Sequence, residues 1–223
     1  MIGWLNFLVL VLSSFLAARY YIKSVSPAQL ERRIGGIAYK KCGKYRIFSC
    51  LFMVLLMGNY VACHFFPLPI PLPGHFPWGW HVSLAAAVVI ALPSVTLMLW
   101  GIRDAGKETL VPQRDGCLYG GIYRYIRHPQ VFGELALLLA IALLLDSPFL
   151  ALLTFVYIPL WAYICIAEEK DLVVRYGRAY EEYRNRTGFW IPRTSTSNAK
   201  RGSVNDLTKA EGSNEETRRN QHR

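Results

Sequence analysis

Long apolar runs alternate with polar or proline-rich stretches along the 223-residue chain. Five runs are apolar enough to lie in lipid, and they cover residues 1–18, 47–66, 81–102, 129–145 and 149–167. A helix needs about twenty residues to cross the apolar core of a bilayer, so the fourth run is short for a full span. The pattern predicts an all-α fold, a polytopic membrane helical bundle of about five transmembrane helices.

The segments between the runs carry turn and cap signals. Ser147 and Pro148 separate the fourth and fifth runs, and they suit the cap and the first position of a helix. We therefore expect these two runs to form a helical hairpin. Prolines near the middle of the third and fifth runs, Pro93 and Pro159, should kink those helices. Residues 67–74 are rich in proline and should form a stiff, extended connector.

The distribution of charge predicts how the chain crosses the membrane. Residues 19–46 contain eight Lys or Arg and one acid, and basic residues also follow the third run. The loop after the second run has no Lys or Arg. Because basic loops stay on the cytosolic side, the N-terminus is expected outside and the C-terminus in the cytosol. The first run could be a signal peptide, but its basic residues follow it, which favours an uncleaved helix.

The C-terminal part differs from the rest. Apolar residues recur at helical spacing over 168–183, which predicts an amphipathic cytosolic helix. Residues 26–33 could form a short interfacial helix. Residues 194–223 are polar and lack an apolar face, which is typical of disorder. We expect one domain over residues 1–192, with its motifs in 80–192, followed by a disordered cytosolic tail over 193–223.

Composition narrows the possible partners. The net charge is +10, but no nucleic-acid-binding motif accompanies it, so the lipid bilayer is the expected partner and nucleic acid is not. The cysteines are scattered and form no CxxC pair, so neither a disulfide framework nor a metal site is predicted. They are Cys42, Cys50, Cys63, Cys117 and Cys165.

Candidate chemistry begins where the fourth run begins. Pro129 fits the first position of that helix, which places Arg127 and His128 at its mouth. The free N–H groups, the positive end of the helix dipole and Arg127 could together bind an anion. Alternatively, Arg127 and His128 anchor the helix to lipid phosphates.

Two further features break the rules of a plain membrane bundle. Gly133 could let a ligand approach the helix backbone, or it could serve helix packing. Glu134 lies at the edge of the apolar zone, where it could pair with Arg127 or receive a ligand cation. Glu168 and Glu169 end the fifth run; they are either a solvated face or the holders of ribose hydroxyls or an ammonium group.

The hairpin should bring the start of the fourth helix and the end of the fifth to one cytosolic surface. That surface would offer an anion pocket, a cation or hydroxyl pocket and an apolar interior. S-adenosylmethionine carries a carboxylate, an ammonium, a ribose and a sulfonium, and so matches this combination.

Two stretches resemble a known family. GIYRYIRHPQVFGE, which ends at Glu134, and EEKDLVVRYGRAYEEY, from Glu168 to Tyr183, resemble the isoprenylcysteine carboxyl methyltransferase and phospholipid methyltransferase group of membrane enzymes. The resemblance covers roughly residues 80–192. It implies a membrane fold of five to eight helices, S-adenosylmethionine as cofactor and a lipidic or prenylated methyl acceptor.

The candidate catalytic residues, which follow from the residues themselves, are Arg127, His128 and Glu134. The resemblance implies the residues of the cofactor site, to which the residue pattern adds Gly133. The candidate cofactor-binding residues are Tyr123, His128, Pro129, Gln130, Val131, Gly133, Glu168 and Glu169, with Asp115, Gly116, Cys117 and Leu118 in a covering loop.

Two departures from the family pattern affect the substrate. Val131 stands where a tyrosine is common, and Ile164 stands where prenylcysteine enzymes carry a basic residue that is thought to meet the substrate carboxylate. Methylation of an isoprenylcysteine carboxylate is the first expectation, and methylation of a phospholipid amine is the alternative. A carboxylate needs no base, whereas an amine would lose a proton to His128 or Glu134. A sterol-type reductase using NADPH and a non-catalytic membrane protein are weaker alternatives. The membrane would be the endoplasmic reticulum in a eukaryote and the plasma membrane in a prokaryote.

Overall fold

The computed structural model describes residues 1–114 and 120–193. Helices make up the secondary structure of this part of the chain, which has no β-strand beyond an isolated bridge between Ile126 and Gly188. The α-helices are α1 (Ile2–Ser24), α2 (Pro27–Ile34), α3 (Ile37–Phe65), α4 (Trp80–Ala105), α5 (Pro129–Leu144), α6 (Pro148–Tyr176) and α7 (Arg178–Arg186), with short 3₁₀ helices η1 (Gly106–Thr109) and η2 (Gly121–Arg124).

Four of these helices, α1, α3, α4 and α6, are long and apolar enough to cross a membrane. The fifth apolar helix, α5, has 16 residues and is therefore about 24 Å long, less than the roughly 30 Å of a bilayer core. The prediction of a polytopic helical bundle is confirmed for the described residues, including the short fourth helix.

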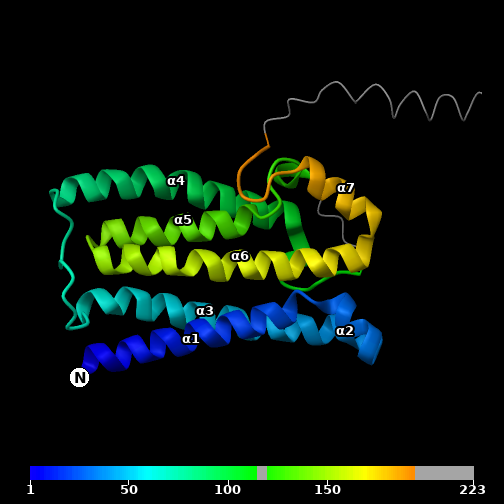
Figure 1. The fold of residues 1–223 in the computed structure, drawn as a ribbon, viewed down its shortest axis with the longest axis horizontal. Helices are drawn as coiled ribbons and strands as arrows, with labels where there is room; N and C mark the ends of the chain where they lie inside the picture. The colour runs from blue at the N-terminus through cyan, green and yellow to red at the C-terminus, as the bar shows by residue number, and fades with distance from the viewer. Residues whose placement is uncertain (115–119, 194–223) are drawn as a thin grey trace, which may run out of the picture. The chain divides into compact units, whose positions relative to one another are not determined.

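The membrane helices of residues 1–192 run alongside one another (Figure 1). Helix α1 packs against α3, and α5 packs against both α4 and α6. Met1, the 67–79 loop and the turn between α5 and α6 lie at one end of the bundle, whereas α2, η1, η2 and α7 lie at the other (Figure 1). Both basic segments predicted to face the cytosol therefore lie at the same end.

Several helices extend further than their apolar runs, and α3 and α6 extend furthest. Helix α3 starts at Ile37, and α6 continues past the apolar run to Tyr176. Apolar runs mark only the part of a helix that suits lipid, and no glycine or proline stops α6 before Gly177, which ends it at a positive φ of 54°. The predicted amphipathic helix over 168–183 is therefore split between the end of α6 and α7.

Buried hydroxyls link the helices in the interior of the bundle. The Tyr60 hydroxyl on α3 donates toward the Leu138 carbonyl at 3.1 Å and the Leu150 carbonyl at 2.9 Å. The hydroxyls of Ser14 on α1 and Tyr157 on α6 are 2.8 Å apart. These bonds join α1 and α3 to the α5–α6 hairpin. The hairpin begins its second helix as predicted, because the Ser147 hydroxyl accepts the Leu150 N–H at 3.4 Å.

Candidate active site

A polar pocket lies at the end of the bundle that holds α2 and α7. It is lined by residues of α1, α3, α4, η1, η2, α5 and α6 and of the segment before α5. Seven of the residues singled out from the sequence line it: Tyr123, Arg127, His128, Pro129, Gln130, Val131 and Glu168. The structure thus brings together the start of α5 and the end of α6, as the hairpin predicted.

His128 is the centre of a buried charge cluster. It caps the N-terminus of α5, and its side chain is 5% exposed. Its Nε2 lies 3.1 Å from Glu169 Oε1, and its Nδ1 lies 3.6 Å from Glu168 Oε2. Burial alone would lower the pKa of His128, but hydrogen bonds with Cys165, Glu168 and Glu169 outweigh it and hold that pKa well above 6.5. His128 is therefore an imidazolium at neutral pH, with both nitrogens facing partners.

Arg127 holds the same cluster together. Its Nε donates to Glu169 Oε1 at 2.7 Å, and its Nη1 donates to the carbonyls of Arg184 and Thr187 at 2.7 and 2.6 Å. Glu134 is not its partner, so the predicted pairing of Arg127 with Glu134 is wrong. The guanidinium fastens the start of α5 to α6 and to the end of α7.

The segment after α7 holds the start of α5 from the other side. The Arg127 N–H donates to the Gly188 carbonyl at 2.9 Å, and the His128 N–H donates to the Phe189 carbonyl at 3.3 Å. The Phe189 ring lies edge-on to the imidazole of His128, with centroids 5.0 Å apart. These contacts fix where the His128 side chain enters the cluster.

Tyr123 and Gln130 form a second wall of the pocket. The Tyr123 hydroxyl donates to the Gly101 carbonyl of α4 at 3.2 Å and lies 3.1 Å from the Gln130 amide nitrogen. Burial, together with the charge of Glu168, raises the pKa of Tyr123, so its hydroxyl stays neutral and serves as a donor. At Gly121, with φ of 53°, a Cβ would overlap the Asp104 carboxylate, which accepts the Ile122 N–H at 2.7 Å. This turn orients the segment that carries Tyr123.

The pocket contains a basic residue that we did not single out from the sequence. Arg46 of α3 is 6% exposed and donates to the Ser24 hydroxyl and to the carbonyls of Glu108 and Thr109, each at 3.1 Å. None of the ion pairs between described residues includes Arg46. Its guanidinium carbon lies 5.1 Å from the centre of the Tyr21 ring, which also lines the pocket. A buried cation without a carboxylate partner favours an anionic ligand.

Other predicted residues have different places. Glu169 is the partner of Arg127 and His128 and does not line the pocket. Gly133 serves helix packing, because a Cβ there would lie 2.7 Å from the Ser94 carbonyl of α4. Glu134 lines a separate cavity. The four residues of the predicted covering loop, Asp115, Gly116, Cys117 and Leu118, lie outside the described residues.

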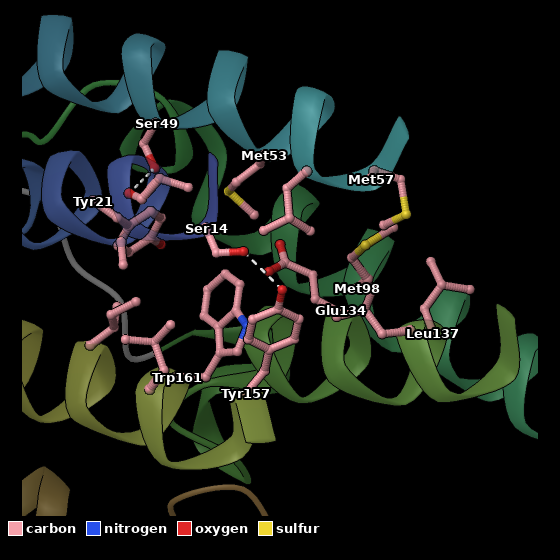
Figure 2. Close-up of a pocket in the computed structure, with 16 residues that line it drawn as sticks. Ser14, Tyr21, Ser49, Met53, Met57, Met98, Glu134, Leu137, Tyr157 and Trp161 are labelled. Carbon is pink, nitrogen blue, oxygen red and sulfur yellow. Dashed lines mark hydrogen bonds between the residues drawn. The ribbon is translucent and has the colours of Figure 1, made fainter. Parts of the chain in front are cut away.

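The separate cavity is apolar and lies between the helices. It has a volume of about 190 Å³ and is lined by residues of α1, α3, α4, α5 and α6 (Figure 2). Tyr21 lines both this cavity and the polar pocket. The two spaces are therefore neighbours within the bundle, one polar and one apolar.

Comparisons with known proteins agree on one kind of chemistry. The sequence model of the family described as phospholipid methyltransferase matches residues 82–179, a little under half of the chain. A methanethiol S-methyltransferase from Pseudomonas sp. strain GM41 is 27% identical over 186 residues, which cover 78% of this chain and 64% of that protein. The chain thus spans slightly less than two thirds of this relative's length. No solved structure matches the chain significantly.

Proposed function

We propose that the chain is a membrane methyltransferase related to the phospholipid methyltransferase family that its sequence resembles, and that it methylates an apolar acceptor with S-adenosylmethionine as the donor. The observation that carries the proposal is the pairing of the two spaces that meet at Tyr21. One has the charges that a zwitterionic donor needs, and the other suits an acceptor drawn from lipid. Neither comparison gives a reductase, so the NADPH alternative has no support from them.

The charges of the polar pocket match those of the donor. Arg46 and the first-turn N–H groups of α5 suit the donor's carboxylate. Glu168, whose side chain is 20% exposed while that of Glu169 is 9% exposed, suits its ammonium or ribose hydroxyls. When bound, S-adenosylmethionine supplies an electrophilic methyl group on a sulfonium sulfur.

The size of the pocket adds a requirement. The polar pocket encloses about 50 Å³ between the described residues, whereas small-molecule sites usually hold about 300 Å³ or more. Donor binding therefore needs the lining side chains to move apart. Because Tyr21 lines both spaces, a rotation of its ring would enlarge the polar pocket toward the apolar cavity.

Within this proposal His128 and Arg127 are positioning residues. His128 is protonated and held between Glu168 and Glu169, so it fixes the Glu168 carboxylate and has no free nitrogen to accept a proton. Arg127 holds Glu169 in place. The chain's own contribution to the rate would be alignment of the two ligands and exclusion of water.

The acceptor is expected to come from the bilayer, and its class separates the candidates. An isoprenylcysteine carboxylate and a phospholipid amine are the two acceptors that the sequence suggested. The relative named for methanethiol adds a small thiol, and the cavity of about 190 Å³ has room for a small acceptor. All three share the methyl donor.

We also propose that the N-terminus faces the outside and that the polar pocket faces the cytosol. The two basic segments lie at the same end of the bundle as the pocket (Figure 1). The opposite end has the 67–79 loop and the 145–147 turn, which contain no Lys or Arg.

Donor binding to the purified full-length protein tests the proposal. Glu168→Gln and Arg46→Gln should each weaken binding of labelled S-adenosylmethionine about 10- to 100-fold, the usual effect of losing a hydrogen bond to a charged group. Glu181→Gln on the exposed face of α7 is the matched control and should bind as the wild type does. Wild-type affinity in both pocket variants, or no donor binding at all, would refute the assignment.

Transfer of a labelled methyl group into a membrane extract, with mass analysis of the product, would then identify the acceptor.

A further inference from the structure

The apolar cavity contains one carboxylate. Glu134 of α5 projects into it between Met53 and Met57 of α3, Met98 of α4 and Tyr157 of α6 (Figure 2). The other lining side chains are aliphatic or aromatic, apart from the hydroxyls of Ser14 and Ser49. These two hydroxyls already have partners, since Ser14 bonds with Tyr157 and with the Leu10 carbonyl, and Ser49 donates to the Ala17 carbonyl.

Glu134 has no partner of its own. No hydrogen bond or ion pair between described residues includes its carboxylate, although a carboxylate among apolar side chains is strongly disfavoured without one. Arg127, one of the two partners that the sequence left open for Glu134, is held by Glu169 instead. The carboxylate is therefore available to a ligand.

The charge around the cavity selects the kind of ligand. No Lys, Arg or His lines the cavity, and Ile164, which stands where a basic residue would meet a substrate carboxylate, is one of its lining residues. A second carboxylate beside Glu134 would be repelled, whereas an ammonium would be attracted. The aromatic rings of Tyr21, Tyr157 and Trp161 also favour a cation.

The cavity is close enough to the polar pocket for transfer between them. Glu134 lies one helical turn from Gln130 and Val131, which line the polar pocket, and residues at this spacing are about 6 Å apart. An acceptor group held by Glu134 would thus lie beside a donor held at the start of α5.

We propose that Glu134 is the residue that selects and deprotonates the methyl acceptor, and that the acceptor is an apolar primary or secondary amine. This inference rests on the proposed function. The first expectation from the sequence was a carboxylate acceptor, and this inference replaces it with the alternative, an amine acceptor.

The reaction balances with Glu134 as the base. The ammonium enters as an ion pair with the carboxylate and gives it one proton, which leaves a neutral amine beside a neutral carboxyl. The amine nitrogen then forms a bond to the methyl carbon as the bond from that carbon to the sulfonium sulfur breaks, and the electron pair stays on sulfur. The product is a methylated ammonium, and the proton on Glu134 is released to water when the product leaves.

Other titratable groups do not fill this role. His128 is already protonated and enclosed by Glu168 and Glu169. The groups that face Glu134 across the cavity are the phenols of Tyr21 on α1 and Tyr157 on α6, while α3 and α4 contribute methionines, Leu56 and Ser49. A carboxylate is a better proton acceptor at neutral pH than a phenol, which is already protonated.

Binding of matched small probes to the full-length protein tests the inference without relying on turnover. An engineered apolar cavity of about 150 Å³ binds benzene, so a cavity of about 190 Å³ has room for a probe with one phenyl ring. Benzylamine, phenylacetate and benzyl mercaptan have similar apolar bodies and differ in the reacting group. We expect benzylamine to bind about tenfold or more tightly than phenylacetate, which corresponds to one favourable charge contact.

Variants connect the preference to Glu134. Glu134→Gln should abolish the preference for benzylamine and leave the affinity for labelled S-adenosylmethionine unchanged. Glu181→Gln removes the same charge from an exposed position and should keep the preference. Equal binding of phenylacetate and benzylamine to the wild type, or loss of phenylacetate binding in Arg46→Gln alone, would overturn the inference in favour of a carboxylate held by Arg46.

Product analysis separates this inference from the proposed function. Methyl transfer to benzylamine that is lost in Glu134→Gln supports both. Donor binding with transfer to benzyl mercaptan or phenylacetate instead would uphold the proposed function and overturn the amine assignment. Selective benzylamine binding in a protein that does not bind the donor would support the role of Glu134 in ligand selection and overturn methyl transfer.

Discussion

Removing the Arg127 side chain should destabilise the protein strongly, because it leaves several buried groups without partners. The guanidinium and the Glu169 carboxylate are each 9% exposed and lie 2.7 Å apart. Arg127→Ala leaves that carboxylate with His128 alone, and it also leaves the carbonyls of Arg184 and Thr187 without a donor. Breaking a buried ion pair from one side usually costs about 3–5 kcal/mol. Since His128 still neutralises part of the charge, we expect about 3 kcal/mol, or about a hundredfold in the folding equilibrium.

The chain offers a matched control in Arg178→Ala. Arg178 also pairs with a glutamate, Glu182 at 3.1 Å, but these side chains are 90% and 65% exposed. Exposed pairs contribute little, so this variant should unfold as the wild type does. Unfolding free energies from denaturant titration in detergent, followed by tryptophan fluorescence, would measure both. Arg127→Ala that unfolds within 1 kcal/mol of Arg178→Ala would contradict the view that Arg127 fastens α5 to α6 and α7.

Three further predictions follow from buried contacts. The pKa of His128 in the folded protein is well above 6.5, so its contribution to stability is complete below about pH 6.5 and is lost as the pH rises through that folded pKa. The unfolding free energies of the wild type and His128→Gln should therefore converge in alkaline buffer. A constant difference between the two free energies from pH 6 to 10 would contradict this. Gly133→Ala should lower the unfolding free energy by about 1–3 kcal/mol because the new Cβ would collide with α4. Gly58→Ala places its Cβ in open space and should not lower it. Equal unfolding free energies of the two variants in the same denaturant titration would refute the packing role of Gly133. Tyr60→Phe should lower the unfolding free energy by about 1–2 kcal/mol because it removes the hydroxyl that donates toward two buried carbonyls. Tyr163→Phe, on the exposed side of α6, should leave the unfolding free energy unchanged. An unchanged unfolding free energy in Tyr60→Phe would mean that its hydroxyl does not link the helices.

The fold follows from the sequence to a large extent because lipid imposes a simple rule. Each membrane helix must be apolar over most of its length, so the apolar runs locate α1, α3, α4, α5 and α6. This rule does not predict where a helix continues beyond the lipid into polar sequence. Within the polar continuation of α6 from Glu168 to Tyr176, Asp171 and Arg175 form a local i,i+4 pair. Arg175 also pairs with Glu108, and Asp171 also accepts the Gln29 N–H; these contacts connect elements far apart in the sequence and give no local signal.

The site was predictable where its residues are close in sequence or unusual in their setting. Tyr123, His128 and Gln130 belong to one short motif, and Glu168 is an acidic residue at the end of an apolar run, so the sequence indicates each of them as a site residue. Arg46 did not, because it ends a basic stretch whose charges had already been assigned to membrane orientation. Its position along the helix was the signal, because Arg46 lies at helical spacing from the small residues Ala38, Cys42 and Ser49, which are buried in α3, and a charged residue is out of place on such a face.

The two spaces also differ in how much of them the family match covers. The match to the phospholipid methyltransferase family covers residues 82–179, which contain most of the polar-pocket residues and Glu134. Helices α1 and α3 lie before that segment, yet they contribute Tyr21 and Arg46 to the polar pocket and Met53 and Ser14 to the apolar cavity. Under the proposed function, similarity in α5 and α6 would preserve the residues that hold the donor, whereas differences in α1 and α3 would change the residues that contact the acceptor. For that reason the acceptor is better inferred from the charge and volume of the cavity in this chain than from the name of a relative.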